Sequence, residues 1–138
     1  MPVFVRFQSS VPNRRGTYPG VFALANGLAS DGLLTEPDRV WWRAANDRAD
    51  ALYAQPSTVD PRCYDTESSP GARAWFKESA TELIAMTQEY LALLDRYGIG
   101  WVELRTSSPG RISYEDDVQV VAVPGSYPGD WPFVIPGG

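Results

Sequence analysis

Arginines and carboxylates are the residue types in this chain that could do chemistry. Arg14 and Arg15 stand in the run Asn13–Thr17, directly before a predicted helix. Free backbone N–H groups at a helix start, together with two guanidinium groups, could hold a phosphate or a carboxylate. The run lacks the glycine spacing and the lysine of a phosphate-binding loop. A solvated turn whose arginines pair with surface acids is therefore the competing interpretation.

An acidic triplet, Glu115, Asp116 and Asp117, interrupts a β-rich stretch near the C-terminus, and Glu103 could lie across a hairpin from it. Carboxylates at this density could hold Mg²⁺ or Ca²⁺, or accept arginines from a partner. No D-x-D-x-D-G loop accompanies them, so a charged, exposed strand edge is the other interpretation. We predict no metal site and no cofactor.

A small-molecule site can also be assembled from these residue types. Arg6 lies on the opening strand, and with Arg14 or Arg15 it could bind a small anionic ligand. Glu115 or Asp117 would then serve as the general acid or base. This gives one of two functional hypotheses, an anion-binding protein or a small enzyme that works without histidine.

The composition excludes several classes of site. The chain has no histidine and a single cysteine, Cys63, which rules out Ser-His and Cys-His catalysis, histidine metal sites and an internal disulfide. A net charge of −5 argues against general nucleic-acid binding. The arginine-rich, lysine-poor basic set is typical of a high-GC bacterial genome. No leader peptide and no apolar run of about 18 residues is present, so we expect a soluble cytoplasmic protein that binds no membrane.

Aromatic side chains supply candidate contacts for a partner. Tyr18 precedes the first predicted helix, and Trp42 diverges by about 100° from the adjacent Trp41 on the next, so that one of the two lies at the rim of the core. Tyr127 and Trp131 belong to a C-terminal stretch rich in proline and glycine. Aromatic residues are common anchors in interfaces, so we regard these four aromatic residues as partner-binding candidates.

Three elements of the chain resemble, in their order, those of mono-ADP-ribosyltransferases. They are Arg6, the run Thr106–Ser108 and Glu115, which stand in the order of that family's Arg, Ser-Thr-Ser and Glu. The resemblance covers only a handful of positions. The serine run falls near a predicted turn, later strands of that fold are missing, and Asp117 stands where the family has its final Glu. So few residues carry no functional assignment.

The pattern of apolar residues predicts the elements that must position these groups. The longest helical pattern runs from Ser69 to Ile99, with Ser69 as N-cap, Pro70 at the first helical position and a Schellman ending at Gly98. Gly32 gives a second predicted Schellman ending, and Thr35 with Asp38 has the spacing of a capping box. The face of the long helix that we expect to be buried consists of Phe76, Ala80, Leu83, Ile84, Thr87, Leu91, Leu94 and Tyr97, widened by Tyr90. Period-two alternation predicts strands, and helical spacing with turn signals predicts two further helices. The remaining predicted elements are a strand over 2–9, helices over 19–31 and from Thr35 to Pro56, an ordered loop over 55–69, and strands over 100–106 and 111–123 that form a hairpin.

These elements predict an α+β fold, a two-layer sandwich of order β-α-α-α-β-β. A three-stranded, mostly antiparallel sheet would carry the helices on one face. Residues 1–123 would form a single domain, and residues 124–138 an extended Pro/Gly/aromatic tail docked on it.

The leading functional hypothesis is a small, acidic, soluble binding protein that acts through protein–protein interaction, of a regulatory or toxin-neutralising type. A protein partner or a homodimer is expected. The small-molecule hypothesis above is the alternative, and the residues leave open whether the chain is an enzyme.

Overall fold

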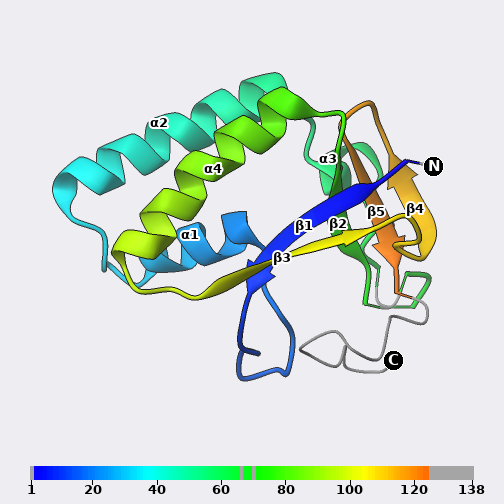
Figure 1. The fold of residues 1–138 in the computed structure, drawn as a ribbon, viewed down its shortest axis with the longest axis horizontal. Coiled ribbons are helices and arrows are strands. Elements are labelled where there is room, and N and C mark those ends of the chain that lie inside the picture. Colours follow the sequence, from blue (N-terminus) through cyan, green and yellow to red (C-terminus); the bar gives the residue numbers. More distant parts are fainter. Residues whose placement is uncertain (1, 66, 70, 125–138) are drawn as a thin grey trace.

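The computed structural model describes residues 2–65, 67–69 and 71–124 of the chain. Figure 1 shows the elements in chain order. They are β1 (Phe4–Ser9), α1 (Val21–Ser30), α2 (Glu36–Leu52), α3 (Pro56–Val59), β2 (Arg73–Lys77), α4 (Thr81–Arg96), β3 (Trp101–Thr106), β4 (Arg111–Glu115) and β5 (Gln119–Val123).

The five strands form one antiparallel sheet in the order β3-β1-β2-β5-β4. The α+β class agrees with the sequence prediction, but the predicted three-stranded sheet is wrong. Two strands were missed: β2 lies inside the predicted long helix, and the predicted strand over 111–123 is divided into β4 and β5 at Asp116 and Asp117.

The long helical pattern therefore begins too early. Residues Arg73–Lys77 form β2, which pairs with β1 and β5, and the helix α4 starts only at Thr81. Ser69 consequently does not start a helix, and Pro70 lies outside the described residues. From Ala80 onward most of the predicted buried face is correct, because Leu83, Thr87, Tyr90, Leu91 and Leu94 are buried. Ile84 and Tyr97 are partly buried.

The predicted hairpin between the strands at 100–106 and 111–123 is also wrong. β3 pairs with β1 at one edge of the sheet, β4 pairs with β5 at the other, and only residues 107–110 connect them. In a flat sheet four strand spacings would separate these edges by about 19 Å, whereas five extended residue steps span at most about 18 Å. The sheet must therefore curl, as the sweep of β3 toward β4 in Figure 1 shows.

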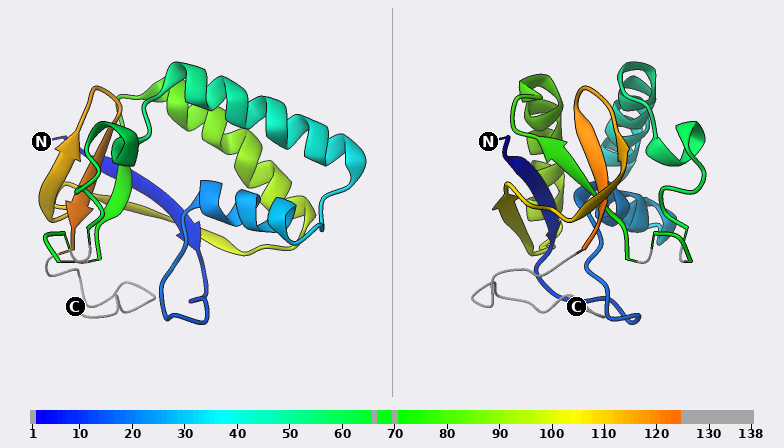
Figure 2. Two further views of the ribbon diagram at one scale, coloured as in Figure 1. Left: turned by 180° about the vertical axis from the view of Figure 1, so that it is seen from behind. Right: turned by 90° about the vertical axis from the view of Figure 1, so that its right-hand side faces the viewer.

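Both faces of the sheet are apolar. Val5, Phe7 and Phe76 face α1 and α4 in the main core. On the opposite face a second cluster contains Phe4, Trp75, Leu104, Val120 and Ala122, with Tyr18 and Val102 packed against it. Figure 2 shows α1, α2 and α4 gathered on one side of the sheet.

The helix ends follow the sequence closely. Gly32 and Gly98 both have φ of +70°, and the Leu33 and Ile99 N–H groups donate to Leu28 and Leu94 carbonyl oxygens at 3.0 Å. These are the two predicted Schellman endings. Thr35 caps α2 as predicted, accepting a hydrogen bond from the Asp38 N–H.

Gly110 allows the short connection between the two edge strands. Its φ of +125° disfavours side chains, and an added Cβ would collide with the Val123 backbone carbonyl. We expect Gly110→Ala to cost about 1–3 kcal/mol of unfolding free energy from backbone strain, before any cost of the collision. Gly27→Ala is the control, because a Cβ there meets nothing within 4 Å and should stabilise α1 by about 0.5–1 kcal/mol. Urea unfolding of both variants measures this, and equal stability of the two would contradict the assignment.

Candidate functional site

Arg6 ties together backbone segments on the sheet face opposite the helices. Its guanidinium donates to the Ala74 carbonyl at 2.9 Å, to the Tyr18 carbonyl at 3.1 Å and to Gln8 Oε1 at 2.7 Å. These bonds join β1 to β2 and to the loop before α1. Three of its N–H groups are thus engaged by the protein itself.

The remaining sequence candidates of the N-terminal half lie apart from one another. Arg14 and Arg15 are exposed in the loop after β1, where the Asn13 side chain organises the turn. Tyr18 packs on the second apolar cluster. Trp42 lies at the rim of the core, with its indole N–H donating to Asn26 Oδ1 at 2.9 Å. Arg6 and Tyr18 do meet, through the hydrogen bond from the Arg6 guanidinium to the Tyr18 carbonyl.

The three residues of the acidic triplet have different surroundings. Glu115 pairs with Lys77 at 2.6 Å, Asp117 is exposed, and Asp116 organises the β4–β5 turn. Burial favours a higher pKa for Asp116, but hydrogen bonds from the Val118 N–H, the Tyr114 hydroxyl and Gln119 outweigh it, and the pKa is lowered. Among the described residues no group of three potential metal ligands gathers anywhere. Tyr127 and Trp131 lie outside the described residues.

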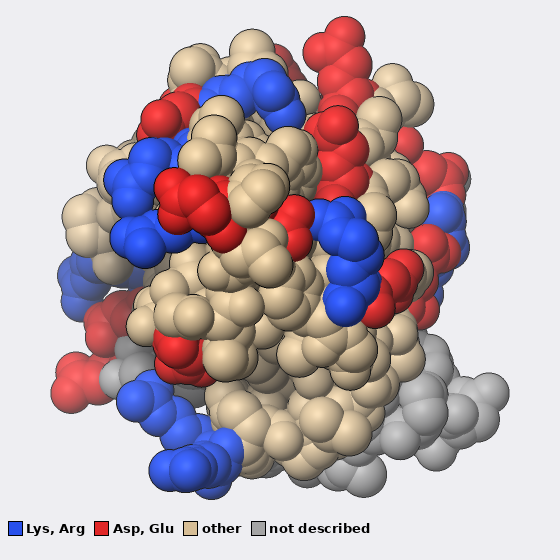
Figure 3. Space-filling model, turned by 90° about the vertical axis from the view of Figure 1, so that its left-hand side faces the viewer, with Lys and Arg blue, Asp and Glu red and all other residues tan. Residues whose placement is uncertain are grey.

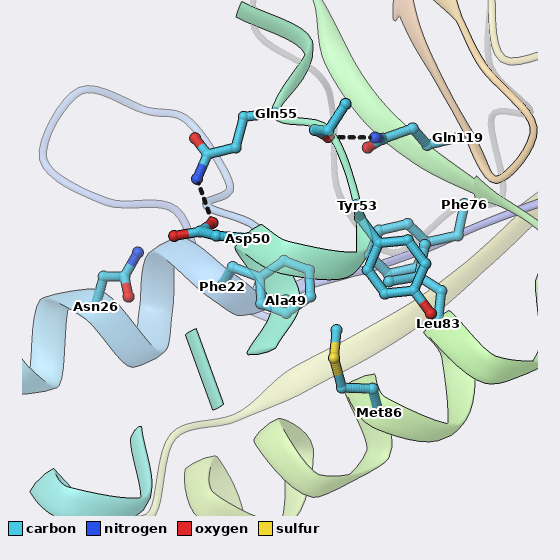
Figure 4. Close-up of a pocket in the computed structure, with 11 residues that line it drawn as sticks. Phe22, Asn26, Ala49, Asp50, Tyr53, Gln55, Phe76, Leu83, Met86 and Gln119 are labelled. Atoms are coloured by element: carbon cyan, nitrogen blue, oxygen red, sulfur yellow. Dashed lines mark hydrogen bonds between the residues drawn. The ribbon is translucent and has the colours of Figure 1, made fainter. Parts of the chain in front are cut away.

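A pocket of about 230 Å³ opens where α1, the C-terminal end of α2 and the start of α4 meet β2 and β5. Its floor is apolar, because Phe76, Leu83 and Met86 are buried core residues. Figure 4 shows Asn26, Asp50 and Gln55 toward one end of the pocket and Tyr53, Phe76 and Leu83 toward the other. The rest of the lining is Phe22, Ala49, Ala54 and Gln119.

A chain of hydrogen bonds holds the three helices around this pocket. The Tyr90 hydroxyl of α4 donates to Asn46 Oδ1 at 2.6 Å, and the Asn46 amide donates to Asn26 Oδ1 of α1 at 3.0 Å. Tyr90 is fully buried, and burial raises its pKa to about 12. It therefore stays a neutral donor at physiological pH.

Asp50 is the carboxylate of the pocket, and it occupies an unfavourable place in the helix. It lies in the last turn of α2, which contains no basic residue, where the negative end of the helix dipole opposes an acidic side chain. One of its oxygens accepts a hydrogen bond from Gln55 Nε2 at 2.9 Å. A carboxylate placed against the dipole suggests a role other than stability.

Two further ionisable groups are poor candidates for chemistry. Burial raises the pKa of the Cys63 thiol, with the charge of Asp60 adding to the effect. Burial, followed by the charge of Glu82, raises the pKa of Tyr53 in the pocket wall. Both groups therefore remain protonated near neutral pH, which makes neither a good nucleophile nor a good base.

Sequence reasoning missed this pocket. Its polar residues, Asn26, Asp50, Gln55 and Gln119, come from three separate stretches of the chain and form no motif. The one available signal was the acidic residue at the C-terminal end of a predicted helix, where basic residues are expected.

Comparison of the chain with protein-family models, with curated sequences and with solved structures gives no match. No helix among the described residues is long and apolar enough to cross a membrane.

The lowered pKa of Asp116 predicts a pH-dependent contribution to stability. Its carboxylate stabilises the folded state above the unfolded pKa of about 3.9, and this contribution is lost as the pH falls through the folded value. We expect Asp116→Asn to lower the unfolding free energy by about 1 kcal/mol at pH 7 and to approach the wild type at low pH, once the carboxyl group is protonated in the folded state. Urea unfolding across pH tests this, with the exposed Asp117→Asn as control. A loss that is equal at neutral and at low pH would contradict the assignment.

The position of Asp50 against the helix dipole predicts a stabilising substitution. Asp50→Asn keeps an acceptor for Gln55 and removes the charge, so we expect a gain of about 0.3–1 kcal/mol in unfolding free energy at low salt. Asp47→Asn, on the same helix but before its last turn, should not show this gain. Chemical denaturation at low and high salt measures both variants, and a clear loss of stability in Asp50→Asn would show that the carboxylate is structural.

Proposed function

We propose that this protein is a non-catalytic binding protein that holds a side chain of a protein partner in the pocket at the end of α2. The observation that carries the proposal is the size and chemistry of this pocket. Pockets for drug-sized ligands and cofactors are usually about 300–1,000 Å³, whereas this one measures about 230 Å³. That volume suits one large side chain better than a nucleotide.

The surface beside the pocket supports a protein as the partner. Leu52, at the end of α2, is 62% exposed, and with Tyr53 it lines a shallow hollow next to the pocket. The lining of that hollow also includes Arg48, Glu82 and Glu89. A buried anchor with a polar rim around it is the usual arrangement of interface hot spots.

The surface charge fits a protein partner better than a nucleic acid. Figure 3 shows acidic and basic side chains interspersed around an uncharged central area on the side of the molecule where α2 begins and α4 ends, away from the pocket. Nucleic-acid binding needs a concentrated positive field. A regulatory or toxin-neutralising protein is the concrete form of the proposal, and a cytoplasmic location is part of it, in keeping with the free, buried thiol of Cys63.

A small anion-binding protein or a histidine-independent enzyme is the alternative. It has less support, because the N–H groups of Arg6 are engaged by β2 and the loop before α1, and Glu115 pairs with Lys77. No observation brings Arg14 or Arg15 to these groups.

Site-specific photo-crosslinking in the source organism tests the proposal. A photoreactive residue at Gln55, on the pocket rim, should give one discrete adduct with a partner protein, whereas one at Arg15, in a distant loop, should not. Ala54→Trp fills the pocket mouth and should abolish the adduct, and Ala51→Trp, on the exposed side of α2, should leave it unchanged. The purified partner should then bind the wild type and the Ala51→Trp variant, but not the Ala54→Trp variant.

Three results would overturn the proposal. They are the absence of an adduct at the rim, an adduct that survives Ala54→Trp, and an adduct made only of two copies of this chain. The last would favour the homodimer, which light scattering of the purified protein would confirm.

A further inference from the structure

The pocket keeps three oxygen atoms that are available as hydrogen-bond acceptors, together with donors. Gln119 Nε2 donates both its protons, to the Ala54 carbonyl at 2.8 Å and to Asp116 at 3.1 Å, so its Oε1 atom is left. Gln55 Nε2 donates to Asp50 Oδ1, which leaves Gln55 Oε1 and Asp50 Oδ2. None of these three oxygens accepts a hydrogen bond from another described residue.

Asn26 contributes the opposite group. Its Oδ1 atom already accepts from Trp42 Nε1 and from Asn46 Nδ2, and only its Nδ2 group is left as a donor. The indole N–H can only donate, which fixes the orientation of the Asn26 amide. Gln55 Nε2 also keeps its second proton, because it donates one proton to Asp50. Donors and acceptors are thus both left at the pocket, and the charge of Asp50 is what distinguishes one ligand from another.

The electrostatic field of the pocket favours a cation. Asp50 is a full negative charge, and it lies in the last turn of α2, where the helix dipole adds roughly half a negative charge. No described residue that lines the pocket is a lysine or an arginine. An anionic ligand would meet repulsion here, whereas an ammonium or guanidinium group would be attracted.

The floor of the pocket defines the rest of the ligand. Phe76, Leu83 and Met86 are buried and apolar, and Phe22 and Tyr53 add aromatic rings. An aliphatic stem can cover such a surface while its charged head remains at the polar rim. The aromatic rings can also attract the cation directly.

We propose that the pocket binds a lysine or arginine side chain of the partner, with the stem on the apolar floor and the charged head at Asp50 and Gln55. This inference rests on the proposed function, because it names the group that the partner presents. It also removes small anions from the ligands this pocket would take.

Titration of the ¹⁵N-labelled protein with capped single residues tests the inference by NMR. The probes are the N-acetyl methylamides of lysine, arginine and norleucine, the last having a similar aliphatic chain and no charge. Lysine or arginine should shift the amide signals of Ala49, Tyr53 and Gln119, and should bind at least about tenfold more tightly than norleucine. Asp50→Asn should weaken binding of the charged probe about tenfold, and Asp47→Asn should change it less than twofold.

The inference is overturned if norleucine binds as well as lysine and arginine, if Asp50→Asn has no effect, or if none of the probes shifts the pocket signals. These outcomes are separable from those of the crosslinking experiment. A partner crosslinked at Gln55 together with no charge preference would retain the proposed function and refute the cationic anchor. Binding of the charged probes without any crosslinked partner would retain the cation site and refute the protein partner.

Discussion

The position of α2 depends on a buried hydroxyl group. In this helix of 17 residues only Ala45 is fully buried, and Trp41, Trp42 and Ala49 pack partly buried against the core. The Tyr90 hydroxyl, buried in α4, must find an acceptor because an unpaired buried donor is costly, and it finds one in Asn46 of α2. Edge-to-face contacts of Tyr90 with Phe22 at 4.8 Å and with Trp41 at 5.3 Å add α1 and α2 to the same centre. The end of α2 that carries Asp50 is placed by this centre.

Features that depend on local chemistry could be predicted from the sequence, whereas features that depend on contacts between distant segments could not. The helix endings at Gly32 and Gly98 depend on local chemistry and were predicted correctly. β2 was not, because Phe76 and Ala80 happen to continue the helical spacing of α4. Arg73–Lys77 is instead a strand because β1 and β5 pair with it, and such distant partners override a local pattern. The pairing of β3 with β1 was equally hidden, since nothing in the connection over 107–110 specifies which strands meet.

The pocket could not be predicted from the sequence, because its hydrogen-bonding character depends on contacts between distant segments. Its acceptors are ordinary amides until the fold uses some of their hydrogen-bonding groups and leaves others. Gln119 could not be recognised as an acceptor before the Ala54 carbonyl and Asp116 were known to take its protons. The opposite holds for the arginines and carboxylates that the sequence analysis selected as site candidates, because the fold uses them for structural contacts. Arg6 and Glu115 are chemically capable residues, but the fold engages them with Ala74, Tyr18 and Lys77.

Two apolar residues of α2 are exposed to solvent. Helical spacing grouped Val40 and Leu52 with the core residues of this helix, yet both are largely exposed, because α2 packs on the core through Trp41, Trp42, Ala45 and Ala49. A helix with apolar residues in solvent and an acidic residue against its own dipole is poorly optimised for the stability of the isolated chain. Binding a partner at the end of α2 would bury Leu52 and pair Asp50 with a cation. The features that weaken this helix are thus the ones that a partner with a cationic anchor would satisfy.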